Sequence, residues 1–269
     1  MKKRIRAVAF SDCGNYRKTN QDAVLVKVMN SNVYGRMMLI GVADGMGGLS
    51  QGEVASSIFI RDLESWFNEQ LPIILQSENS IIRIVDSVQE SLKSLYKKVN
   101  TKIRIFGKKK GIKLGTTASV LFTLAGRFLT VNVGDSRIYQ VCRSKCIQIT
   151  KDQSYVQRLI DGGAAGNKAV RNSRNNNILL QCLGVTEEVS PDINKGKSKN
   201  VGKDYEYTYM ACTDGFWKEL EDTEIHRYLC PQMCISEAAM ESLLGRLKDM
   251  ARQRGEMDNM TAALIYEAE

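Results

Sequence analysis

The order of hydrophobic patterns along the chain restricts the possible folds more than any other feature of the sequence. Three stretches with alternating or β-branched residues come first, at 5–10, 23–28 and 37–42, joined by short polar or glycine-containing turns. Such stretches predict antiparallel strands. Two long segments at 53–71 and 80–103 follow, with apolar residues at helical spacing. Because strands and helices come in blocks instead of alternating, we expect antiparallel sheets with helices packed outside them.

The second half of the chain begins with another block rich in strand patterns, over 116–149. At 129–133, for example, apolar and polar residues alternate, as expected of a strand with one buried face. The further expected elements are a short helix at 153–160, irregular structure at 162–177 and 190–204, a strand at 207–212, a long amphipathic helix at 236–252 and a last strand at 261–266.

The composition indicates one folded domain. The chain has 269 residues, 43% of them hydrophobic, which is enough to bury a substantial core. It has few prolines and no low-complexity tract or repeat of the kind that marks linkers and solenoids. We therefore expect a single domain over 1–269, and a monomer.

The charge is basic. There are 38 basic and 30 acidic residues, for a formal net charge of +8, with short clusters at 2–6 and 108–113. Such a surface suits anionic partners, among them nucleic acid and phosphorylated protein. No nucleic-acid-binding motif or interleaved aromatic pattern accompanies the charge. Nucleic-acid binding is therefore the weaker alternative, and we expect no nucleic-acid partner.

The cysteines and the apolar runs indicate the cellular compartment of the protein. Seven cysteines contain no C-x-x-C pair, and His226 is the single histidine, which argues against a zinc ribbon, a redox motif or a mixed zinc site. The basic start is interrupted by Ser11 and Asp12, too soon for a signal-peptide core, and the longest apolar run, 37–43, is far too short for a membrane span. We expect a cytoplasmic protein with no membrane partner.

Acidic residues recur at sharp turns beside strongly apolar strands. A lone Asp-Gly pair is more often a turn than a ligand. Five such sites in one chain change that balance, because strands could gather them at one edge of a pair of sheets. The five residues are Asp22, Asp44, Asp135, Asp214 and Asp258.

Clustered carboxylates repel one another unless a cation neutralises them. Oxygen ligands without histidine point to magnesium or manganese, not to zinc or copper. Gly45, which follows Asp44, would let a backbone carbonyl approach an ion closely. Arg17 precedes Asp22 by five residues, and its guanidinium is suited to a two-point grip on a phosphate. Together these residues predict a phosphoryl-transfer site.

The motifs that carry these residues resemble the metal-dependent protein phosphatases of type 2C, the PPM family, in its bacterial form. The match extends over nearly the whole chain. In order, it comprises D-C-G-N-Y-R-K-T-N-Q-D (12–22), V-A-D-G-M-G-G (42–48), G-T-T-A (115–118), N-V-G-D-S-R-I-Y (132–139), T-K-D-Q-S (150–154), L-G-V (183–185), C-T-D-G-F-W (212–217) and D-N-M-T (258–261).

The resemblance implies an α+β fold, with a central sandwich of two antiparallel sheets flanked by helices on both sides. It also implies a serine/threonine phosphatase whose two Mn²⁺ or Mg²⁺ ions activate a bridging water for direct attack on phosphorus. Its partners would be phosphorylated proteins, the substrates of a cognate serine/threonine kinase.

The resemblance also implies residue roles. Asp44 would bridge both ions, Asp22 and the Gly45 carbonyl would contribute ligands, and Asp214 and Asp258 would complete the other ion. Arg17 would hold the substrate phosphate. Asp135 matches the position of a third, weaker metal ion in bacterial members.

Three positions depart from patterns common in the family. Met46 stands where many eukaryotic members have a histidine discussed as a general acid, Gln21 replaces a glutamate, and Gln153 replaces a histidine. The segment around 161–180 occupies the place of the family's flap, where Lys168, Arg171 and Arg174 could contact acidic phosphopeptides, though a solvated loop fits equally well.

One alternative within the same family is an inactive relative that serves as a binding module. The retained acidic residues argue against it, because a pseudoenzyme has no need to keep repelling carboxylates together.

Overall fold

One sheet contains the first and last strands of the chain. β1 (Arg4–Asp12) pairs with β11 (Met260–Ala268), which pairs with β10 (Glu206–Cys212). β7 (Arg137–Val141) and β8 (Cys146–Gln148) continue this sheet, and all its pairings are antiparallel. The structure is a computed structural model, and it describes residues 4–47, 51–163, 178–198 and 206–268.

The other sheet contains two hairpins, β2 with β3 and β5 with β6, which pair with each other through β3 and β5. All its pairings are antiparallel as well. In order across the sheet it contains β2 (Asp22–Ser31), β3 (Gly35–Gly47), β5 (Ala118–Leu124), β6 (Arg127–Val133) and β9 (Asp192–Lys197), and β4 (Leu114–Thr116) pairs with the end of β3.

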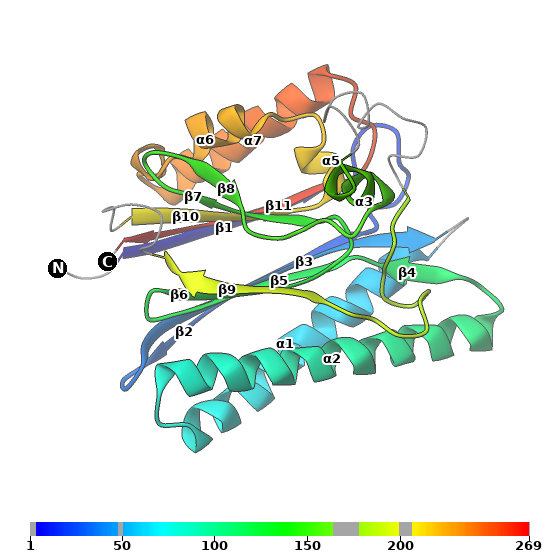
Figure 1. Ribbon diagram of the computed structural model, residues 1–269. Coiled ribbons are helices and arrows are strands. Elements are labelled where there is room, and N and C mark those ends of the chain that lie inside the picture. Colours follow the sequence, from blue (N-terminus) through cyan, green and yellow to red (C-terminus); the bar gives the residue numbers. More distant parts are fainter. Residues whose placement is uncertain (1–3, 48–50, 164–177, 199–205, 269) are drawn as a thin grey trace.

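Helices cover the outer face of each sheet (Figure 1). The helices α1 (Gly52–Ser77) and α2 (Ile81–Lys110) pack on the sheet that contains β3, and α6 (Asp222–Leu229) and α7 (Glu237–Gln253) pack on the other. Serine side chains accept from backbone N–H groups at the starts of α2 and α7. Shorter helices are α3 (Tyr155–Asp161), α5 (Asp214–Trp217) and the 3₁₀ turn η2 (Pro231–Met233).

The space between the sheets is filled by side chains from the inner faces of both. Ile40 and Leu121 from one sheet and Tyr209 and Ile265 from the other belong to one buried cluster. Two further apolar clusters each join one sheet to the helices that cover it. These layers confirm the predicted α+β sandwich with helices on both sides. Within the described ranges, no helix is both long enough and apolar enough to span a membrane.

Some sequence-based predictions differ from the structure. The first long helix runs to Ser77, six residues beyond the expected end, and α6 was not expected. The expectation of irregular structure over 190–204 is wrong for its first half, because β9 lies there and pairs with β6. Its sequence, DINKGK, has few strand-forming residues, and main-chain hydrogen bonds to a neighbouring buried strand define it instead. The second helix also runs seven residues beyond 103, to Lys110. The predicted flap, with Lys168, Arg171 and Arg174, falls mostly outside the described residues.

Candidate active site

The register of β2 and β3 places two of the predicted carboxylates side by side. Asp22 begins β2, Asp44 lies near the end of β3, and the two are direct partners in the antiparallel ladder. Direct partners point to the same face of a sheet, about 5 Å apart. Thr117 holds the Asp44 backbone, since its amide donates to the Asp44 carbonyl (2.9 Å) and its hydroxyl accepts from the Asp44 N–H (2.8 Å). The G-T-T-A motif therefore fixes this carboxylate.

The other predicted acids reach the same edge from separate connections. Asp135 lies in the turn between β6 and β7, Asp214 begins α5 directly after β10, and Asp258 precedes β11. They surround a cavity of about 410 Å³. The cavity is lined by Arg17, Gln21, Asp44, Gly45, Met46, Lys113, Leu114, Asp135, Leu179, Val185, Asp214 and Asp258. The structure thus brings the predicted site residues together, with Asp22 adjoining the cavity through its pairing with Asp44.

Crowding and burial make these carboxylates hard to ionise together. Burial raises the pKa of Asp44 well above its usual range, and the charges of Asp214, Asp22 and Asp135 raise it further. Burial also raises the pKa of Asp22 to about 7, against a hydrogen bond from the Thr213 hydroxyl (2.7 Å) that lowers it. The pKa of Asp135 is raised by burial first and by Asp214 next. Lys218 and Arg137 lower the pKa of Asp135, but these two cations do not offset the effect of burial.

The donor set fits hard divalent cations. All the acidic groups supply oxygen, and a cation would relieve the repulsion that helps to raise the pKa values of Asp22 and Asp44. In the part of the chain that the structure describes, however, no three His, Cys, Asp or Glu side chains are arranged to hold a single ion. This arrangement agrees with magnesium-like ions, which usually keep several waters and take only one or two carboxylates each. The residues therefore fit ions that are only partly enclosed by protein.

Gly45 is required by close backbone packing. A Cβ at this position would lie 2.2 Å from the Gly52 carbonyl oxygen and 2.6 Å from the Gln21 carbonyl oxygen. The Gly45 amide donates to that same Gln21 oxygen at 3.1 Å. Glycine therefore lets the start of α1 and the residue before β2 approach β3 next to Asp44. The sequence alone did not reveal this packing role of Gly45.

Arg17 lies at the rim of the cavity and is paired with Asp258. Its Nε and one terminal nitrogen donate to the two carboxylate oxygens at 3.0 and 2.8 Å. The Arg17 side chain is 54% exposed, so solvent and an incoming anion can reach it. The two residues predicted to bind phosphate and metal thus hold each other in this structure.

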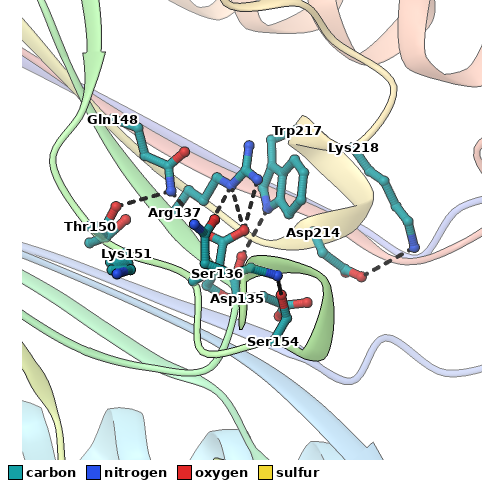
Figure 2. A network of polar contacts seen from close by, with 12 residues as sticks. Asp135, Ser136, Arg137, Gln148, Thr150, Lys151, Ser154, Asp214, Trp217 and Lys218 are labelled. Carbon is teal, nitrogen blue, oxygen red and sulfur yellow. Dashed lines mark hydrogen bonds and ion pairs between the residues drawn. The ribbon is translucent and has the colours of Figure 1, made fainter. Parts of the chain in front are cut away.

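A buried network behind Asp135 was not anticipated from the sequence (Figure 2). The guanidinium of Arg137 lies 3.2 Å from the centre of the Trp217 ring and is gripped by Asp152 through bonds of 2.7 to 3.1 Å. The Trp217 indole N–H in turn donates to the Asp135 carbonyl at 3.1 Å. The network ties the Asp135 turn to α5, which carries Asp214. Arg137 and Trp217 stand inside the quoted motifs, but no spacing argument connects them.

Gln153, which stands in place of a histidine, also has a structural role. Its side-chain oxygen accepts from the Gly134 amide at 3.2 Å, and its side-chain nitrogen donates to the Ser190 carbonyl at 2.9 Å. Gln153 therefore supports the turn that carries Asp135 by neutral hydrogen bonds. Met46 lines the cavity and has no titratable proton to offer a leaving group.

The raised pKa of Asp22 predicts that the metal-free protein loses stability as pH rises. The pKa goes from 3.8 to about 7 on folding, so the stabilisation is fully present below pH 3.8 and is lost as pH passes about 7. Thermal unfolding in EDTA should show a falling Tm between pH 5 and pH 8, and an Asp22→Asn variant should show a flatter profile. An equal slope in both proteins would contradict the assignment.

Comparison with known proteins identifies the family. The model of the family described as protein phosphatase 2C matches residues 16–176, more than half of the chain. The chain belongs to the protein phosphatase 2C family. Among curated relatives, it is 29% identical over 258 residues to protein phosphatase PhpP of Streptococcus pneumoniae, covering 95% of both chains. It is 28% identical over 256 residues to serine/threonine phosphatase stp of Listeria monocytogenes, covering 95% of this chain and 93% of that one.

Solved structures agree with this placement. The catalytic domain of serine threonine protein phosphatase PstP, in complex with two manganese ions, superimposes with a TM-score of 0.77 at 26% identity and full coverage of both chains. Serine/threonine phosphatase Stp1 from Staphylococcus aureus gives a TM-score of 0.79 at 26% identity, covering 99% of this chain and 95% of that one.

Proposed function

We propose that this chain is a metal-dependent protein serine/threonine phosphatase that acts at the acidic cavity with two Mn²⁺ or Mg²⁺ ions. The observation that carries the proposal is the convergence of Asp22, Asp44, Asp214 and Asp258 from separate segments. Burial and neighbouring carboxylates raise the pKa values of Asp22 and Asp44 at this place. The two manganese ions of the similar PstP domain support the count of ions.

Asp44 is the central ligand in this proposal, because its pKa responds to Asp214, Asp22 and Asp135 together. Asp22 and the Gly45 carbonyl would hold one ion together with Asp44. Asp214 and Asp258 would hold the other ion together with Asp44. Asp135, ranked lower, is assigned to a third, weaker ion. When bound, the ions supply Lewis acidity that lowers the pKa of water and neutralises charge on a phosphate.

The chain's own groups bind and orient the substrate. Arg17 presents a planar guanidinium at the cavity rim, where it can exchange the Asp258 carboxylate for two phosphate oxygens. Asp44, whose pKa is raised by burial and by the charge of Asp214, would lose its proton when cations occupy the cavity. Because Met46 cannot donate a proton, the leaving alkoxide takes its proton from water.

The substrates are phosphorylated proteins, and we assign the opposing reaction to a cognate serine/threonine kinase. We also propose a cytoplasmic monomer, and one domain over 1–269. The seven cysteines are all free thiols, as expected in a reducing compartment. The pairing of β1 with β11 supports the single domain, because the two ends of the described chain complete one sheet.

The direct test measures hydrolysis of p-nitrophenyl phosphate and of a phosphothreonine peptide in EDTA, Mg²⁺ or Mn²⁺. We expect no turnover in EDTA and turnover on adding either ion, because the carboxylates are functional only as ligands. A folded protein that hydrolyses neither substrate under any metal would contradict the proposal and favour an inactive binding module. Salt-sensitive DNA binding without turnover would favour the nucleic-acid alternative.

A further inference from the structure

Four lysines at the end of α2 form a positively charged surface that the catalytic proposal does not use. They are Lys108, Lys109 and Lys110 in the last turn of the helix, and Lys113 just after it. All four are exposed, and none of their side chains makes an ion pair or hydrogen bond with another described residue. We refer to these residues as the α2 lysine cluster.

Helix stabilisation explains only part of this cluster. Cations in the last turn of a helix interact favourably with its C-terminal carbonyls, which accounts for the first three lysines. Lys113 lies beyond Gly111, the left-handed residue that ends α2 (φ 67°), so it is outside the helix. The interaction with the helix C-terminus therefore does not account for Lys113.

The backbone holds Lys113 at the catalytic cavity. The next residue, Leu114, pairs with Gly47 in the β3–β4 ladder, and the same ladder pairs Gly45 with Thr116. The Thr116 hydroxyl donates to the Asp44 carbonyl at 3.0 Å. Lys113 itself lines the cavity together with Arg17 and the acidic residues. A cation without a described partner is therefore fixed at the mouth of the site.

The tight end of α2 places the turn that carries the other three lysines next to the segment that contains Lys113. The Ile112 amide donates to the Gly107 carbonyl at 3.0 Å, and a Cβ at Gly107 would lie 2.7 Å from the Ile112 carbonyl oxygen. The last helical turn is thus packed against the segment that leads into β4. Figure 1 shows this end of α2 on the same side of the molecule as β4.

When a phosphopeptide binds with its phosphate in the cavity, the residues that flank the phosphorylated residue must cross the rim. Each residue of an extended peptide advances about 3.3 Å, so side chains close to the phosphorylated residue come within reach of a lysine at the mouth. Arg17, the other cation that lines the cavity, is engaged with Asp258. We propose that the α2 lysine cluster binds acidic side chains that flank the phosphorylated residue, and so gives the enzyme a preference for acidic substrates. This inference rests on the proposed phosphatase function.

The test compares two phosphothreonine peptides that differ only in aspartate or asparagine at the flanking positions. For each protein the readout is the ratio of kcat/KM for the acidic peptide to that for the neutral one. We expect a ratio of roughly 10 for the unmodified chain, since each exposed ion pair contributes a few-fold at most. The ratio should fall as salt is raised, because exposed charges are screened.

A variant with Gln in place of Lys108, Lys109, Lys110 and Lys113 should bring the ratio to about 1, and Lys113→Glu alone should lower it several-fold. The control replaces Lys97 and Lys98 by Gln. These two lysines are exposed on the same helix, about 18 Å from its end at 1.5 Å per residue. The control should keep the original ratio.

An unmodified ratio near 1, or a ratio that survives the fourfold replacement, would overturn the inference while leaving the phosphatase intact. Failure of the unmodified chain to hydrolyse p-nitrophenyl phosphate with Mn²⁺ would overturn the proposed function itself.

Discussion

Replacing Asp44 by asparagine should lower kcat for p-nitrophenyl phosphate in Mn²⁺ by more than about 10³-fold, since losing one group that stabilises transition-state charge already costs 10²–10³. Asp44 is the direct ladder partner of Asp22, and the charge of Asp214 raises its pKa. Asparagine keeps the shape of the side chain but removes the charge that a cation requires.

The same variant should be at least as stable as the unmodified chain in EDTA, because it removes one of several repelling carboxylates. Its rise in Tm on adding Mn²⁺ should be lost. Asp249→Asn, an exposed carboxylate on α7, is the matched control and should change neither result. Retention of more than a tenth of the unmodified kcat would contradict the central role of Asp44.

Replacing Asp152 by asparagine should destabilise the protein by about 3–5 kcal/mol, because it leaves the buried Arg137 without its counter-charge. The two side chains are only 5% and 8% exposed, and their closest nitrogen and oxygen atoms are 2.7 Å apart. At 2–4 °C per kcal/mol, we expect a loss of about 10 °C in Tm by calorimetry.

The exposed pair of Asp86 and Lys195 gives the matched comparison. Its nitrogen–oxygen distance is 2.6 Å, nearly the same, but both side chains are about half exposed. Asp86→Asn should therefore cost less than about 1 kcal/mol. A double replacement of Arg137 by Met and Asp152 by Leu should recover much of the lost stability, because no buried charge is left unpaired. Equal losses for Asp152→Asn and Asp86→Asn would refute this reasoning.

The sequence alone predicted the layers because the strand and helix patterns are strong and come in blocks. The helix at 80–103 shows why: its buried residues, among them Leu92 and Val99, keep helical spacing, and packing on the sheet follows from that face. β9 could not be predicted in the same way. Its residues are partly or largely exposed, and its strand conformation depends on pairing with β6, which is far away in the sequence.

The acidic residues of the site were also predictable, since each stands at a turn beside an apolar strand. The contacts between them were not. Spacing cannot show that Arg17 pairs with Asp258 across 241 residues, or that Trp217 reaches the carbonyl of Asp135. Such contacts depend on how the two sheets are stacked, which is a property of the whole fold.

The pairing of β1 with β11 sets an order on the assembly of the enzyme. β1 is an edge strand whose hydrogen-bonded neighbour in the described sheet is β11, so β1 cannot join this sheet before β11 has been synthesised. Asn259, just before β11, accepts from the Gln21 amide and donates to the Cys13 carbonyl, which fastens the Arg17 segment. A nascent chain that lacks this region cannot close the acidic cavity. We therefore expect no dephosphorylation by chains that end before β11, because they lack the strand on which β1 pairs.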